Sequence, residues 1–133
     1  MISTRGRYAL RVMIDLAENQ ADGYIPMKDV AVRQGISPKY LEQIMPILSR
    51  NRLVKAVHGK GGGYRLAAEP ADIVIGDVLR LTEGSLAPVA CLAEGAEKCE
   101  RESSCQTIDF WRGLSKVING YLDSKTLADL MSN

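Results

Sequence analysis

The sequence predicts a mainly α-helical protein with one small β-hairpin. Three observations support this fold class: two short segments with helical apolar spacing meet at Gly35, a glycine-rich hairpin is expected over residues 53–66, and an apolar stripe runs through residues 104–122. Two helices, a glycine turn and a hairpin in this order describe a winged helix-turn-helix. A length of 133 residues suits one small domain with an extension, and 46% hydrophobic residues argue against global disorder.

The first two helices follow from the apolar period and its interruptions. Residues 4–20 are expected to form a helix that Thr4 caps. Its inward positions are Ala9, Val12, Met13, Leu16 and Ala17. A second, shorter helix is expected over residues 27–34, and Gly35 then supplies a turn residue that tolerates a positive φ.

The third helix is expected to start with Ser37 as N-cap and Pro38 in its first turn, and to reach about Arg50. Its apolar stripe comprises Leu41, Ile44, Met45 and Leu48. Pro46 lies inside this pattern, so we expect a kink or a missing backbone hydrogen bond.

The second half of the chain holds less regular structure. A helix is expected over residues 75–82, ended by Gly84, and residues 85–103 read as irregular. A long helix is expected over residues 104–122, and Thr126 with Asp129 predicts a capped last helix. The long stripe comprises Ile108, Trp111, Leu114, Val117, Ile118 and Tyr121.

The net charge of +1 hides an asymmetry between the two halves of the chain. Residues 1–66 contain 11 Lys and Arg against 5 Asp and Glu, whereas residues 67–133 contain 6 against 11. A basic half joined to an acidic half indicates an end that binds a polyanion. No apolar run approaches the roughly 20 residues of a membrane helix, and the N-terminus lacks a signal-peptide core, so a cytoplasmic protein without membrane contact is expected.

The third helix carries polar residues where the fold would expose them, as a helix in a DNA major groove requires. The residues expected to face DNA are Ser37, Pro38, Lys39, Tyr40, Glu42 and Gln43. Gln43 could form two hydrogen bonds with adenine, and Glu42 could accept one from a cytosine amino group. Phosphate contacts are expected from Lys39, Arg50, Arg52, Lys55, Lys60 and Arg65. A helical hairpin with a solvated face is the alternative that the pattern leaves open.

The glycine-rich tip of the hairpin is expected to lie along the DNA backbone or minor groove, because glycine lets the main chain approach closely. Its candidate contact residues are His58, Gly59, Lys60 and Gly61. An enzymatic phosphate loop is excluded by three positions: Val54 and Gly61 break the Walker spacing, and Tyr64 breaks the dinucleotide fingerprint.

Three cysteines, Cys91, Cys99 and Cys105, form a C-x7-C-x5-C pattern. Buried inert thiols, a disulfide with one thiol left over, and a metal or iron–sulfur site with a non-cysteine fourth ligand all remain open. Asp109 is a candidate fourth ligand, because it lies four residues after Cys105 and one turn along the expected helix. Other candidates are Glu100, Glu102 and a group from a second subunit. A thiol redox enzyme is not expected, since no C-x-x-C pair and no neighbouring histidine is present, and we expect no enzymatic activity.

The motifs at residues 3–9, 34–43 and 59–66 together resemble the Rrf-type bacterial winged-helix transcription regulators, the IscR/NsrR/CymR family, with most similarity to its IscR members. The resemblance implies a homodimer whose long helices cross-pack, bound to a double-stranded DNA operator. It also implies an iron–sulfur cluster on Cys91, Cys99 and Cys105 that controls operator affinity. The domains expected are a winged helix-turn-helix at residues 1–84, a cluster loop at 85–103 and a dimerisation helix with a C-terminal tail at 104–133.

The resemblance leaves two points open. Ile108 stands where IscR members carry a histidine ligand, so the fourth ligand, and with it a two-iron or four-iron cluster, is undetermined. The alternative function is a cofactor-free regulator of sulfur or cysteine metabolism that a partner protein controls, as in CymR-like members.

Overall fold

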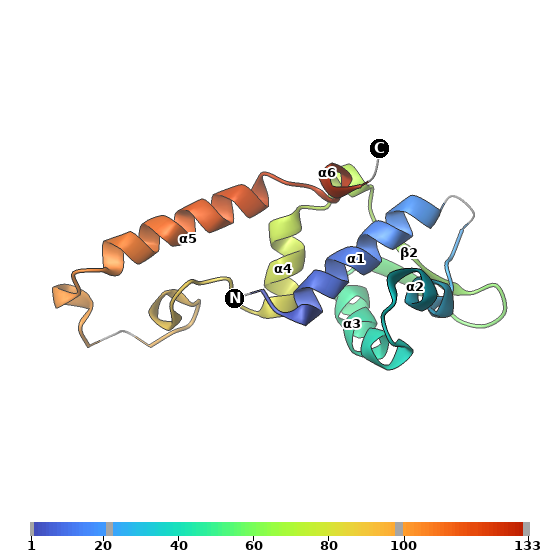
Figure 1. The fold of residues 1–133 in the computed structure, drawn as a ribbon, viewed down its shortest axis with the longest axis horizontal. Helices are drawn as coiled ribbons and strands as arrows, with labels where there is room; N and C mark the ends of the chain where they lie inside the picture. The colour runs from blue at the N-terminus through green and yellow to red at the C-terminus, as the bar shows by residue number, and fades with distance from the viewer. Residues whose placement is uncertain (1, 21–22, 98–99, 132–133) are drawn as a thin grey trace.

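The computed structural model describes residues 2–20, 23–97 and 100–131. Its helices and strands are α1 (Thr4–Asn19), α2 (Met27–Gln34), α3 (Pro38–Arg50), β1 (Val54–Val57), β2 (Gly63–Leu66), α4 (Ile75–Glu83), α5 (Ile108–Asp123) and α6 (Leu127–Leu130). Short 3-10 turns lie at Pro70–Asp72, Ala90–Leu92 and Glu102–Ser104. The first four helices and the hairpin form a winged head, and α5 extends away from it (Figure 1). The expected fold class, mainly α with a two-stranded wing, is confirmed.

The helix-turn-helix is built as the local signals indicate. Gly35 ends α2 in the left-handed conformation at φ 64°, and its N–H bonds back to the Ala31 carbonyl. The Ser37 hydroxyl then accepts from the Tyr40 amide and caps α3. The helix continues through Pro46 to Arg50 without a break. The cap of α1 differs from expectation: Ser3, not Thr4, accepts from the Gly6 amide.

The wing is an antiparallel hairpin that pairs Val54 with Leu66 and Val57 with Gly63. Ile25, from the loop before α2, adds a bridge to Tyr64 with two backbone hydrogen bonds of 2.8 Å. Gly63 makes this approach possible, since a Cβ there would lie 2.3 Å from the Ile25 carbonyl oxygen. Strand β2 is therefore hydrogen-bonded to the loop before α2 as well as to β1.

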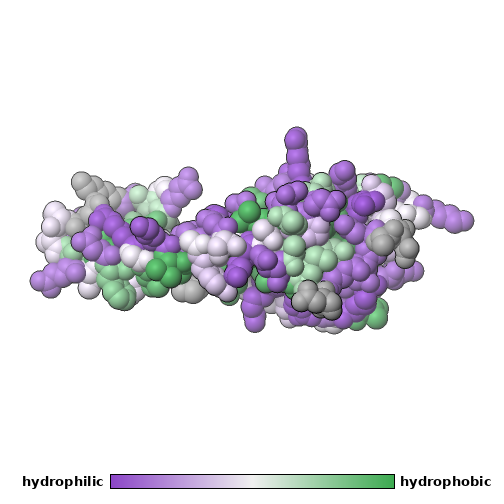
Figure 2. All heavy atoms as spheres, turned by 90° about the horizontal axis from the view of Figure 1, so that it is seen from above, coloured by the Kyte–Doolittle hydropathy of each residue, from purple (hydrophilic) through white to green (hydrophobic). Residues whose placement is uncertain are grey.

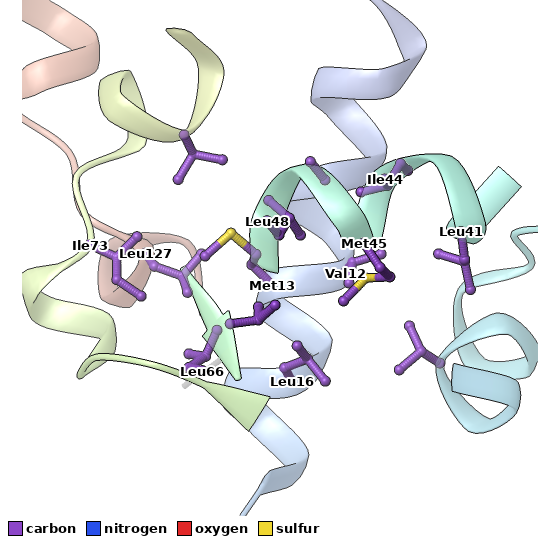
Figure 3. Packing of buried hydrophobic residues seen from close by; sticks show 14 of the residues in the cluster. Val12, Met13, Leu16, Leu41, Ile44, Met45, Leu48, Leu66, Ile73 and Leu127 are labelled. Carbon is purple, nitrogen blue, oxygen red and sulfur yellow. The ribbon is translucent and has the colours of Figure 1, made fainter. Parts of the chain in front are cut away.

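The core of the head is formed by one face each of α1, α2, α3 and α4, closed by the hairpin and by α6 (Figure 3). Its largest fully buried side chains are Met13, Leu16, Leu41, Ile44, Met45, Leu48 and Leu127. Leu127 belongs to α6, which returns the chain to the head after α5 through a bridge between Val74 and Thr126. The expected capping box of α6, from Thr126 and Asp129, is present.

The long helix α5 begins at Ile108, later than the expected start near Ser104. All sixteen of its residues are described, and none is buried. The part of the molecule that extends from the head, on the left in Figure 2, has apolar patches on its surface. Within the described residues, no helix is long and apolar enough to cross a bilayer.

Candidate nucleic-acid interface

The outer face of α3 is polar and open to solvent. Six residues predicted to contact DNA are exposed there: Ser37, Pro38, Lys39, Glu42, Gln43 and Arg50. Tyr40 departs from the expected outward orientation, because it is half-buried and its ring meets Tyr8 of α1 edge-on, with centroids 5.3 Å apart. This face therefore presents amide, carboxylate and cationic groups together, as reading base edges and phosphates requires.

The wing tip presents its main chain. His58, Gly59, Lys60 and Gly61 are all exposed. Gly59 and Gly61 have φ values of 92° and 77°, a region that residues with a Cβ rarely adopt. Gly62 has no room for a side chain, since its Cβ would lie 2.2 Å from the Val57 carbonyl oxygen. A bare backbone with one cationic side chain, Lys60, is the result.

The sequence did not predict a cluster of polar contacts to a buried carboxylate, that of Asp15, under the helix-turn-helix. Asp15 of α1 is 2% exposed and accepts from Arg33 Nε at 2.9 Å, from Arg33 Nη2 at 2.7 Å and from Gln34 Nε2 at 2.9 Å. The hydrogen bond to Asp15 raises the pKa of the Arg33 guanidinium above its ordinary value. The only signal in the sequence is an acidic residue between the inward positions Met13 and Leu16.

The cysteine-bearing segment links α4 to α5. Cys91 is an exposed free thiol, Cys105 is a half-buried one, and Cys99 lies outside the described residues. The Cys105 Sγ lies 3.5 Å from the Thr107 hydroxyl. Hydrogen bonds from the side chain and amide of Thr107, with a smaller one from the Ile108 amide, lower the pKa of the Cys105 thiol, as expected for a thiol beside a helix start.

The geometry expected for Asp109 does not hold. Cys105 precedes α5 instead of lying on it, so the two residues are not one helical turn apart on a common face. The Asp109 side chain is 93% exposed and pairs with Arg112 at 3.3 Å. Among the described residues, a set that omits Cys99, no three side chains of His, Cys, Asp or Glu come together as a metal site.

Comparison with known proteins decides the family. The sequence model of Rrf2, described as "Iron-dependent Transcriptional regulator", matches residues 2–133. The chain belongs to the Rrf2 family. It is 39% identical over 132 residues to the HTH-type transcriptional regulator IscR of Serratia proteamaculans (strain 568), with 99% of this chain and 79% of that protein covered.

Solved structures of Rrf2 regulators have the same fold. CymR, the global cysteine regulator of B. subtilis, has a TM-score of 0.81 at 38% identity, with 98% of this chain and 95% of that chain covered. T. potens IscR has a TM-score of 0.76 at 39% identity, with coverage of 98% and 85%. This Rrf2 protein is thus a DNA-binding, winged-helix transcription regulator and not an enzyme, as the sequence predicted.

Proposed function

We propose that this Rrf2 regulator binds its operator as a homodimer and that an iron–sulfur cluster on Cys91, Cys99 and Cys105 controls this binding. One observation carries the proposal: all three cysteines of the chain lie between α4, the last helix of the head, and α5. A cluster held there would constrain the chain segment that leads from α4 to α5, two helices that Arg80 of α4 already joins through Asn119 and Asp123 of α5, at 2.7 and 2.8 Å. As a DNA-binding protein with reduced thiols, it would act in the cytoplasm.

DNA reading is assigned to the exposed face of α3 and to the wing tip. Gln43 and Glu42 would contact base edges, and Lys39, Arg50 and Lys60 would contact phosphates. Ser37 and the start of α3 would offer hydrogen bonds to phosphate, with Pro38 and Tyr40 shaping that turn. His58, Gly59 and Gly61 would bring the wing backbone close to the minor groove.

The homodimer is supported by the apolar side chains of α5 that are exposed to solvent. Phe110, Val117 and Tyr121 are 66%, 68% and 63% exposed, and the Phe110 ring packs edge-on against Trp111 at 4.9 Å. An apolar helix face of this length is a usual site of subunit contact. Two copies paired through α5 would present two α3 helices to half-sites about one turn of DNA apart.

The thiols fit an iron–sulfur cluster by their chemistry. Cys91 is exposed, and Cys105 has its thiolate form favoured by Thr107 and the start of α5. Thiolates are the usual ligands of such clusters, which supply a redox-sensitive cross-link between the segments that hold them. The fourth ligand would come from Asp109, Glu100, Glu102 or a group of the second subunit, and the cluster would hold two or four irons. The chain's own part is to convert this cross-link into a changed placement of α5, and hence of the two heads.

Anaerobic purification tests the cluster. The protein should be coloured and contain iron and sulfide, and Cys99→Ala should lose both, whereas Ser103→Ala in the same segment should keep them. Loaded and cluster-free protein should then differ in affinity for a common DNA duplex at matched salt, measured by fluorescence anisotropy. Equal affinities on every duplex tried would contradict control by the cluster.

A second candidate is favoured by the likeness to CymR of B. subtilis, the global cysteine regulator. Here a partner protein, and not a cofactor, would control a regulator of sulfur or cysteine metabolism. The purified protein would then be colourless, and replacing all three cysteines with alanine would leave DNA binding unchanged.

A further inference from the structure

Three side chains of α1 lie in a row beneath the helix-turn-helix. Tyr8, Arg11 and Asp15 are three and four residues apart, a spacing that places them on one face of a helix. Asp15 holds the end of α2 through Arg33 and Gln34, as described above. These three side chains lie beside the apolar stripe of α1, and they make polar and aromatic contacts with the helix-turn-helix.

Arg11 makes two kinds of contact from the middle of this row. Its Nε donates to Gln34 Oε1 at 3.2 Å, and its Nη2 donates to the main-chain oxygen of Gln34. A carbonyl in the last turn of a helix has no partner within that helix, and a cation at this end also complements the helix dipole. Arg11 thus holds α2 directly before the Gly35 turn.

The same guanidinium stacks on Tyr8, with its central carbon 5.0 Å from the ring centroid. Tyr8 in turn meets Tyr40 at 5.3 Å and an interplanar angle of 70°. Tyr40 lies in the first turn of α3, where its amide donates to the Ser37 hydroxyl at 3.1 Å. This chain of contacts joins Arg11 to the turn that immediately precedes Glu42 and Gln43.

We propose that Arg11 is a positioning residue for operator recognition: by bonding the end of α2 while stacking on Tyr8, it fixes the orientation of α3 relative to α1. The proposal rests on the proposed role of α3 as the reading helix. Arginine is required because its planar group can donate in the plane and stack on its face at once, whereas the ammonium of lysine is a point charge.

Arg11→Lys tests this role, because it retains the charge and removes the combination of contacts. The probes are a duplex that the wild-type protein selects from a random-sequence library and a scrambled duplex of equal composition. Affinity for the selected duplex should fall about tenfold, the effect of one or two lost hydrogen bonds, while affinity for the scrambled duplex changes less than about twofold. Tyr8→Leu should show the same pattern, and the double variant should lose little more than either single variant.

Arg7→Lys is the matched control, since Arg7 is exposed on the same helix and bonds only Thr4 at 3.1 Å among the contacts described. It should leave both affinities unchanged. Gln43→Ala separately checks α3 as the reading helix: if it leaves selectivity intact, the proposed function fails. If Gln43→Ala reduces selectivity but Arg11→Lys binds like the wild type, or loses both duplexes equally together with a lower melting temperature, the inference about Arg11 is overturned.

Discussion

In the winged head, the apolar faces of α1, α3 and α4 bury their side chains against one another, whereas the apolar stripe of α5 is half-buried in part and exposed in part. Met13, Leu16 and Leu48 are fully buried, but Val117 and Tyr121 are more than 60% exposed. Both regions have the helical apolar spacing that predicts an inward face. The difference shows that the head buries its own apolar residues, whereas α5 keeps an apolar surface free for the proposed subunit contact.

The largest effect is expected when one leucine in the head and one in α5 are each replaced with alanine and the free energies of unfolding are compared. Leu48→Ala in the head should lower the free energy of unfolding by about 2–5 kcal/mol, because the side chain is fully buried and leaves a cavity. Leu114→Ala in the half-buried stripe of α5 should instead have a cost that varies with protein concentration, because dimerisation is linked to stability. Denaturant unfolding at several protein concentrations measures both. A concentration-independent loss for Leu114→Ala would remove the distinction.

The second effect concerns the dimer itself. Val117→Asp should weaken self-association by at least about thirtyfold, roughly 2 kcal/mol, because an unpaired carboxylate would be buried in the apolar contact. Lys116→Asp introduces the same side chain at a neighbouring exposed position outside the apolar stripe, and it should have a much smaller effect. Sedimentation equilibrium compares the two variants. If both variants stayed dimeric, α5 could not be the subunit contact.

Local chemistry made most of the head predictable. The limits of α2, the left-handed Gly35 and the Ser37 cap depend on residues within one turn of each other. The cap of α1 does not: the Ser3 N–H and hydroxyl both donate to Glu83 Oε1, at 3.0 and 2.8 Å. A contact spanning 80 residues selects Ser3 over the adjacent Thr4, and no local pattern contains that information.

The sequence predicted the side chains of the candidate site whose orientation follows from the apolar stripe of their own helix. It did not predict those whose orientation depends on a contact with another helix. Lys39, Glu42 and Gln43 are exposed as the apolar stripe of α3 requires. Tyr40 also lies outside the apolar stripe of α3, but its ring packs against Tyr8 because α1 supplies an aromatic partner there. Asp15 was missed for the same reason, since its partners come from α2.

A smaller effect is expected at Arg52, where the backbone conformation lowers the stability of the head. Arg52, between α3 and β1, is the one described non-glycine residue with a positive φ, at 60°. Arg52→Gly should stabilise the head by about 0.5 kcal/mol, because relief of the backbone cost of about 1 kcal/mol exceeds the extra entropy of glycine in the unfolded chain. Arg52→Ala keeps that cost and should give no gain. Thermal unfolding of both variants tests this, and equal stabilities would show that the backbone is not strained there.

The smallest effect concerns the return of the chain from α5 to the head. The Thr126 amide donates to Asp129 at 2.8 Å, and this hydrogen bond lowers the pKa of the Asp129 carboxyl below its ordinary 3.8. The ionised carboxylate therefore stabilises the fold above the unfolded-state pKa, and the contribution disappears as pH falls through the folded-state pKa. Asp129→Asn should lower the melting temperature slightly at neutral pH and converge with the wild type in acid, with Asp72→Asn as the control for net charge. A difference that persists in acid would mean that the charge of Asp129 does not stabilise this cap, and that the bridge between Val74 and Thr126 and the burial of Leu127 attach α6 to the head without it.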